Sequence, residues 1–312
     1  MKVFSGTSCI ELSENICSKL REKNNDIKLG DLKIDRFSDG EILPNFLESV
    51  RGEDIFFIQS LYNSDIIIET LLVIDAAKRA GCKSFNLVAP YMAMSRQDKK
   101  DHNRSSFGAK MVANILESSG IDQLITIELH NPAICGFYNI PVINLNGNKI
   151  FIDYILEKNI EDLCILAPDA GAQKRASNFG KKIQNSSFAM INKKRTKPNI
   201  IDSVELLGEV KDKNVLIIDD MLDTCGTVCS VTELLINNGA KSVSAIASHG
   251  VLSGKALSNI NNSSLNKILV SDSIPNRYTK NNKIVYVSCD KLLADVIHAL
   301  THKESISKIN DI

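Results

Sequence analysis

VLIIDDMLDTCGT, residues 215–227, is the stretch that decides the fold class of this 312-residue chain. The apolar run from Val215 to Ile218 has the composition of a buried strand, and it stops at the carboxylates of Asp219 and Asp220. A polar loop then leads into a helix after Gly226. Because a buried strand that passes through a short loop into a helix is half of a βαβ unit, this stretch predicts an α/β fold with a mainly parallel sheet.

The same strand end offers the groups that a sugar phosphate needs. Ligands of open α/β sheets collect at the carboxyl ends of strands, where the Asp219 and Asp220 carboxylates can accept hydrogen bonds from sugar hydroxyls. Backbone N–H groups, two Thr hydroxyls and a Gly at a helix start suit a phosphate. These groups belong to Asp223, Thr224, Cys225, Gly226 and Thr227. The alternative is an ordinary strand-to-helix turn with Asp and Thr as caps, and the two adjacent carboxylates favour the ligand site.

Apolar runs of strand length alternate with segments of helical period in two successive series. The first series contains EDIFFIQS, SFNLVAP and LITIEL, with a helix expected from about Asp65 to Ala80. The second contains LCILAP, SFAMI, VLIIDD, SVSAIAS and KIVYVS, and it ends in a helix around Val296. The polar stretch NLNGN separates the two series. We therefore expect two domains, residues 1–146 and 147–312, each with a mainly parallel sheet flanked by helices.

Composition excludes several classes of protein. Lys plus Arg and Asp plus Glu each number 37, so the net charge is zero and we expect no nucleic-acid partner. No run approaches the ~20 apolar residues of a membrane span, and the first residues lack the pattern of a secretory signal, so we expect no membrane partner and a cytoplasmic location. The eight scattered cysteines are typical of a reduced protein and do not have the spacing of a zinc site.

Further motifs accompany the strand end in a characteristic order. They are FSDGE (37–41), ESVRGEDIFFIQS (48–60), SRQDKK (95–100), ELH (128–130), PDAGA (168–172) and NKKR (192–195). IDDMLDTCGT alone resembles the phosphoribosyl-binding motif of type I phosphoribosyltransferases. The whole set is similar in order and spacing to the ribose-phosphate pyrophosphokinases, also called PRPP synthetases, and the resemblance covers nearly the whole chain.

The resemblance implies two phosphoribosyltransferase-like domains and a reaction in which ATP donates a diphosphoryl group to the C1 hydroxyl of ribose 5-phosphate. It implies ATP contacts in the first domain, from Phe37, Asp39, Glu41, Arg96, Gln97 and His130. The sugar and its phosphate are then bound by Asp219, Asp220 and the loop from Asp223 to Thr227. Taken alone, FSDGE would be a turn, RQDKK a solvated charged run, and His130 a structural residue at a strand end.

Catalytic and metal-binding residues also follow from the resemblance. Lys193 and Arg195 match the basic residues of a mobile catalytic loop, where cations stabilise charge on the transferred group. His130 and Asp169 match residues that bind Mg²⁺ near the ATP phosphates. Without the resemblance, KKR would be a surface patch and Asp169 a helix cap.

The resemblance further implies a homo-oligomer, a hexamer built as a trimer of dimers, because a neighbouring subunit supplies the FSDGE loop. Two departures from the family pattern bear on the site. A run with Gly108 replaces the usual residues after Arg104, and Ala172 stands where a second Gly is common, so its methyl group is expected to crowd the pyrophosphate loop.

Three alternatives remain open from the sequence. A phosphoribosyltransferase that consumes PRPP would share the IDDMLDTCGT element, but it does not account for FSDGE or SRQDKK. A non-catalytic subunit associated with the synthetase would have no need of Lys193, Arg195, His130 or Asp169. A transcription regulator on the phosphoribosyltransferase fold is disfavoured by the neutral charge.

Overall fold

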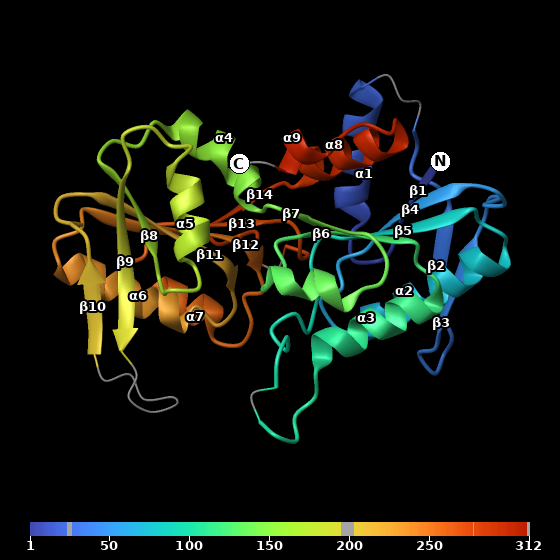
Figure 1. Cartoon of the computed structure of the whole chain (residues 1–312), viewed down its shortest axis with the longest axis horizontal. Helices are drawn as coiled ribbons and strands as arrows, with labels where there is room; N and C mark the ends of the chain where they lie inside the picture. The colour runs from blue at the N-terminus through green and yellow to red at the C-terminus, as the bar shows by residue number, and fades with distance from the viewer. Residues whose placement is uncertain (24–26, 101, 195–202, 277, 311–312) are drawn as a thin grey trace. The chain divides into compact units, whose positions relative to one another are not determined.

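A computed structural model describes residues 1–23, 27–100, 102–194, 203–276 and 278–310 of the chain (Figure 1). The contacts divide it into two compact units. The first comprises Met1–Asn146, Ser273–Pro275 and Ser288–Asp311. The second comprises Gly147–Asp272 and Asn276–Val287. The last long helix therefore belongs to the first unit, although it follows the second unit in the sequence.

The first unit contains a five-stranded parallel sheet in the order β1-β4-β5-β6-β7. Its strands are β1 (Lys2–Ser5), β4 (Asp54–Ile58), β5 (Ser84–Ala89), β6 (Gln123–Ile127) and β7 (Val142–Leu145). The helical elements are α1 (Ile10–Glu22), α2 (Ser64–Arg79), α3 (Gly108–Ser119), the 3₁₀ helix η1 (Pro132–Phe137), α8 (Asp290–Thr301) and α9 (Ser307–Asn310). A separate antiparallel hairpin consists of β2 (Leu32–Arg36) and β3 (Ile42–Phe46).

The core of the first unit forms where the apolar faces of α2 and α3 pack on the sheet. Phe57 of β4 and Phe85 of β5 are fully buried, with ring centroids 5.8 Å apart. Helix α2 begins where the Asn63 side chain accepts a hydrogen bond from the Ile66 N–H at 2.9 Å, which satisfies one of the free donors of the first turn. The expected helix from Asp65 to Ala80 is thus observed one residue earlier.

The second unit contains a seven-stranded sheet in the order β10-β9-β8-β11-β12-β13-β14, parallel except for the β9–β10 pair. Its strands are β8 (Leu163–Ala167), β9 (Ser187–Lys194), β10 (Ser203–Leu207), β11 (Asn214–Leu222), β12 (Ser242–Gly250), β13 (Ile268–Ser271) and β14 (Ile284–Val287). Its helices are α4 (Asn148–Lys158), α5 (Gln173–Gly180), α6 (Gly226–Asn237) and α7 (Ala256–Asn262).

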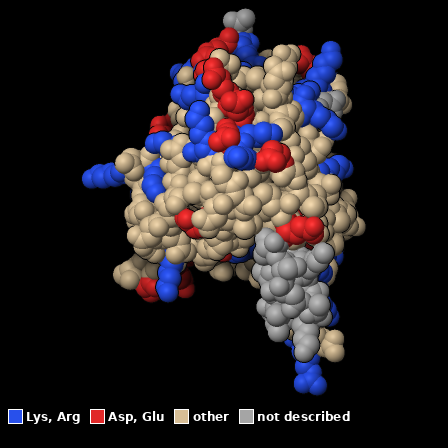
Figure 2. Space-filling view, turned by 90° about the vertical axis from the view of Figure 1, so that its left-hand side faces the viewer, with Lys and Arg blue, Asp and Glu red and all other residues tan. Residues whose placement is uncertain are grey.

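A buried core of the second unit joins strands and helices far apart in sequence. Ile217 of β11, Ala245 of β12 and Ile268 of β13 pack with Leu235 of α6 and Ile260 of α7. The two parallel sheets flanked by helices confirm the predicted α/β class. On the face shown in Figure 2, basic and acidic side chains of the described residues lie interspersed. Within the described ranges, no helix is long and apolar enough to cross a bilayer.

Candidate functional site

The strand that carries the two carboxylates is longer than the sequence predicted. β11 continues through Asp219 and Asp220 to Leu222, because β12 keeps pairing with it as far as Leu222 and Gly250. On its other side, β8 pairs only as far as Ile217. The prediction that the strand stops at Asp219 was therefore wrong, but both carboxylates lie beyond the end of β8, at the carboxyl edge of the sheet where ligands bind.

Arg175 of α5 lies against both carboxylates. Its Nη1 is 3.8 Å from Asp219 Oδ1 and 4.0 Å from Asp220 Oδ1, and the exposed fractions of these side chains are 14%, 28% and 8% in that order. Burial, and next the neighbouring Asp220 carboxylate, raise the pKa of Asp219 well above its usual range, and Arg175 opposes this rise. Asp219 and Asp220 thus form an acid pair, and Arg175 is the cation that lies against it among the described residues.

Sequence reasoning missed Arg175, although a signal was present. Lys174 and Arg175 lie in the first turn of α5, where the helix dipole disfavours cations. A cation in that position needs an acidic partner elsewhere, and Arg175 has two.

The phosphate loop, Asp223–Thr227, follows β11 and opens α6. Cys225 precedes the first helical residue with φ of 61°, the left-handed conformation, so the chain turns sharply before the helix begins at Gly226. Burial raises the pKa of the Cys225 thiol to about 12, so its side chain is neutral, and it donates to the Asp223 carbonyl at 3.8 Å. Thr224 and Thr227 are exposed at the surface of this loop.

Asp169 lies in the turn between β8 and α5. Its Oδ1 accepts a hydrogen bond from the Ala172 N–H at 3.1 Å, so it makes the capping contact that the sequence left as its alternative role. Ala172 has helical φ and ψ of −83° and −10°, and its side chain is only 2% exposed. The expectation that its methyl group crowds the loop is not supported, since the methyl group is buried and the backbone needs no glycine there.

Three of the candidate ATP residues, Arg96, Gln97 and His130, lie on two connected segments of the first unit. Arg96 and Gln97 follow β5, and His130 follows β6; all three are exposed. The segments are joined by a hydrogen bond from Asn131 Nδ2 to Asp98 Oδ2 at 2.7 Å. The structure therefore brings the residues next to Arg96, Gln97 and His130 together at the carboxyl ends of neighbouring strands.

Gly108 makes room for Gln97 at the start of α3. A Cβ at Gly108 would lie 2.5 Å from Gln97 Oε1 and 3.1 Å from its Cβ. The Gln97 side-chain oxygen also accepts a hydrogen bond from Ser106 Oγ at 2.9 Å. The backbone carbonyl of Gln97 accepts a hydrogen bond from the Ala109 N–H at 3.2 Å. The unusual run after Arg104 thus holds Gln97 in place.

FSDGE forms the turn between β2 and β3. The Phe37 N–H donates to the Glu41 carbonyl at 2.9 Å, and the Glu41 N–H donates to Asp39 Oδ1 at 3.1 Å. Gly40 has φ of 95°, which explains the glycine. The Phe37 ring is 54% exposed, so this loop presents an apolar ring to the outside of its own chain.

The candidate catalytic residues are placed only in part. The backbone of Lys193 belongs to β9 and pairs with Val204 of β10, whereas Arg195 lies outside the described residues. Among the described residues, no three His, Cys, Asp or Glu side chains form a group that could hold a metal ion by themselves. His130 and Asp169 belong to different units. A lone carboxylate such as Asp169 fits Mg²⁺ that arrives with substrate phosphates, which is the usual mode for this ion.

The fold and the loop place the chain among α/β proteins in which a strand of a mainly parallel sheet leads through a short loop into a helix N-terminus at the carboxyl edge of the sheet. A family model for the N-terminal domain of ribose phosphate pyrophosphokinase matches residues 1–120, and one for the phosphoribosyl synthetase-associated domain matches residues 167–310.

Full-length relatives agree with the family models. The ribose-phosphate pyrophosphokinase of Porphyromonas gingivalis is 41% identical over 310 residues, which covers 98% of this chain and 96% of the relative. That of Bacillus caldolyticus is 38% identical and covers 100% of this chain and 98% of its own. The crystal structure of phosphoribosylpyrophosphate synthetase from Mycobacterium smegmatis matches with a TM-score of 0.88 and 30% identity, over 97% of this chain and 99% of that one. The chain belongs to the ribose-phosphate pyrophosphokinase family.

Proposed function

We propose that this chain is a ribose-phosphate diphosphokinase, which transfers the β,γ-diphosphoryl group of ATP to the C1 hydroxyl of ribose 5-phosphate and gives PRPP and AMP for nucleotide biosynthesis. The similarity to ribose-phosphate pyrophosphokinases over 98% of the chain carries this proposal. The match of residues 1–120 to the N-terminal domain of such enzymes favours synthesis of PRPP over its consumption. The eight free cysteines fit a reducing compartment, and we place the reaction in the cytoplasm.

Ribose 5-phosphate binds at the carboxyl edge of the second sheet. The ionised Asp219 and Asp220 accept hydrogen bonds from ribose hydroxyls, and Arg175 favours that ionised form. The 5-phosphate is held by the N–H groups of the phosphate loop, together with the Thr224 and Thr227 hydroxyls at the N-terminus of α6.

ATP is bound by residues of the first unit. Arg96 and Gln97 contact the nucleotide, and His130 lies near its phosphates. Phe37, Asp39 and Glu41 act on the ATP of a neighbouring subunit, for which the exposed Phe37 ring is suited to stack on adenine. This arrangement requires a homo-oligomer, which we propose to be a hexamer built as a trimer of dimers.

In the reaction, the C1 hydroxyl oxygen forms a bond to the β-phosphorus of ATP, the bond from that phosphorus to the oxygen of AMP breaks, and the hydroxyl proton passes to solvent. Lys193 and Arg195 stabilise the negative charge on the transferred group and on the departing AMP. Asp169 and His130 are the residues that would hold Mg²⁺ together with the substrate phosphates, and this ion would neutralise charge on the phosphate oxygens.

The test is incubation with ATP, ribose 5-phosphate and Mg²⁺ over a range of phosphate concentrations, with AMP and PRPP measured as products. Equal amounts of AMP and PRPP are expected. Consumption of PRPP in the presence of a nucleobase, without AMP from ATP, would instead identify a phosphoribosyltransferase. Absence of both activities, with ribose 5-phosphate still bound, would favour a non-catalytic subunit.

A further inference from the structure

The phosphate loop has free donors whose direction must be fixed. Within the part of the chain that the structure describes, the N–H groups of Thr224, Cys225, Gly226 and Thr227 donate no hydrogen bond. Such groups bind an anion only if they converge on it. When the peptide planes of a short loop rotate, its N–H groups no longer converge on one point. The residues that pack against the loop therefore affect how tightly it binds an anion.

A segment after β12, Leu252–Asn259, lies against the phosphate loop and is called the bracing segment below. The Leu252 N–H donates to the Leu222 carbonyl at 3.0 Å, which continues the β11–β12 pairing past the strand ends. The Ser253 N–H donates to the Asp223 carbonyl at 3.2 Å, and the Ser253 hydroxyl donates to Asp223 Oδ1. Both the backbone and the side chain of Asp223 are therefore held by one serine.

The helix that follows supplies one further contact. Asn259 of α7 donates from its side-chain Nδ2 to the Thr224 carbonyl at 2.9 Å. The flanking residues Ala256 and Ile260 are fully buried in the core of the second unit, so α7 presents Asn259 from a fixed position. Leu252 is also fully buried and has φ of 47°, a strained conformation that persists only where the surroundings impose it.

Peptide geometry connects these contacts to phosphate binding. In a planar trans peptide, the carbonyl of one residue and the N–H of the next point in opposite directions. Fixing the Asp223 carbonyl against Ser253 therefore turns the Thr224 N–H away from the bracing segment. Fixing the Thr224 carbonyl against Asn259 does the same for the Cys225 N–H, so two consecutive donors face the open side of the loop.

From this geometry we propose that Ser253 and Asn259 are positioning residues, which orient the phosphate-loop N–H groups for the 5-phosphate of ribose 5-phosphate. The proposal rests on the proposed function for the identity of the ligand. Neither side chain touches the phosphate. The Asn259 side chain acts through the Thr224 carbonyl. The Ser253 side chain acts through the Asp223 carboxylate, beside the backbone N–H that holds the Asp223 carbonyl. Their removal should weaken binding of ribose 5-phosphate and leave ATP binding unchanged.

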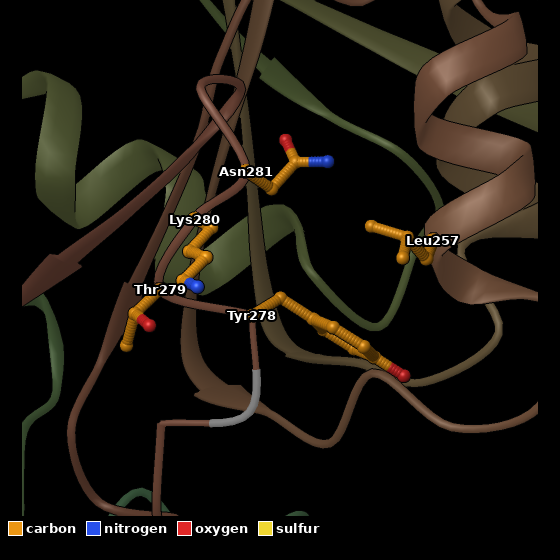
Figure 3. Close-up of a pocket in the computed structure, with 5 residues that line it drawn as sticks. All are labelled: Leu257, Tyr278, Thr279, Lys280 and Asn281. Carbon is orange, nitrogen blue, oxygen red and sulfur yellow. The ribbon is translucent and has the colours of Figure 1, made fainter.

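Helix α7 offers a matched control. Asn261 lies two residues after Asn259, but its Oδ1 accepts from Asn281 Nδ2 at 2.9 Å, on the side of a cavity of about 430 Å³. Figure 3 shows Leu257 of α7 and the segment from Tyr278 to Asn281 around this cavity. Asn259→Ala and Asn261→Ala thus each remove one asparagine hydrogen bond from the same helix, and only the first bond holds the phosphate loop.

The experiment measures dissociation constants of ribose 5-phosphate by titration calorimetry without ATP, followed by KM for both substrates. Loss of one neutral hydrogen bond corresponds to a factor of roughly 2 to 10. We expect Asn259→Ala to raise KM and Kd for ribose 5-phosphate roughly fivefold, with KM for ATP unchanged. Ser253→Ala should raise them less, because it removes the hydroxyl bond to the Asp223 carboxylate but keeps the N–H bond to the Asp223 carbonyl. Ser253→Thr keeps the hydroxyl and should restore wild-type binding, and Asn261→Ala should match the wild type.

Different outcomes test the bracing role and the proposed function. Equal affinities of Asn259→Ala and Asn261→Ala for ribose 5-phosphate would overturn the bracing role, as would a parallel rise in KM for ATP. Asn259→Leu, which nearly keeps the shape of the side chain but loses the donor without adding a charge, gives the same comparison if the alanine variant is unstable. A wild-type chain that binds ribose 5-phosphate and forms no AMP would overturn the proposed function, while the bracing role is still decided by the ratio of dissociation constants.

Discussion

Replacing Arg175 with Gln should move the pH dependence of ribose 5-phosphate use to higher pH. In the proposed function, Asp219 and Asp220 accept hydrogen bonds from sugar hydroxyls, and an ionised carboxylate is the stronger acceptor. Arg175 Nη1 lies 3.8 Å and 4.0 Å from their nearest oxygens, and it favours the ionised form of both. Burial and mutual repulsion of the two carboxylates act in the opposite direction.

The magnitude follows from these distances. Two unit charges about 4 Å apart interact by roughly 4 kcal/mol at an effective dielectric constant of about 20, and partial exposure of Asp219 reduces this value. An arginine beside an aspartate typically lowers the pKa of the carboxyl by about 1 to 3 units. Removing the arginine therefore raises the pKa of the pair, and we expect the acidic limb of kcat/KM for ribose 5-phosphate to shift upward by about one pH unit.

The sign and the control make the test specific. Activity increases as the pair loses its proton, so the variant should be most impaired at low pH and should recover as the pH rises through the new pKa. Lys174→Gln removes a neighbouring cation of α5 that is exposed, and its pH profile should match the wild type. Arg175→Lys should shift the profile less than Arg175→Gln. Superimposed profiles for Arg175→Gln and the wild type would refute the reasoning, and so would a loss of activity that is the same at every pH.

Three further predictions concern other positions. Lys193→Ala should leave the thermal unfolding midpoint unchanged but lower kcat by at least ~10²-fold, because in the proposed function this cation stabilises charge on the transferred group; near-normal turnover would contradict the role. Gly108→Ala should raise KM for ATP, because the new Cβ displaces the Gln97 side chain. It should leave the free energy of unfolding within about 1 kcal/mol of the wild type, because the exposed glutamine can move aside and the unfolded chain loses freedom. Gly136→Ala, where no atom lies within 4 Å of an added Cβ, is its control in the same two assays. Ala172→Gly should leave kcat within about twofold of the wild type but destabilise the chain by roughly 1 kcal/mol in urea unfolding, since a buried methyl group is lost and the unfolded chain gains freedom; a gain in activity would instead support crowding by the methyl group.

The sequence predicted the central strands of both sheets but not β1, β7 or the hairpin that carries FSDGE. Apolar runs such as EDIFFIQS and LCILAP became β4 and β8, because a strand buried on both faces is continuously apolar. Strand β3, ILPNF, contains Pro44 and alternates half-buried with exposed residues. Proline weakens the sequence signal for a strand, and only the pairing with β2 defines β3.

The site shows the same limit. The phosphate loop and its carboxylates were predicted from one contiguous stretch, because the chemistry that suggests them is local. The extension of β11 to Leu222 depends on pairing with β12, which a polar run such as Asp219 and Asp220 does not reveal. Arg175 and Asn259 reach the site through tertiary contacts from α5 and α7. Their roles therefore required the structure.

Transfer of the diphosphoryl group is tested most directly with ATP that carries a label on its β-phosphorus. The labelled ATP is incubated with ribose 5-phosphate and Mg²⁺, and the label is followed into the products. The label should appear in PRPP, and AMP should form in equal amount. Asp220→Asn should abolish this transfer, and Asn261→Ala should not. Formation of ADP with the label retained in it, or no label in any sugar phosphate, would contradict the account.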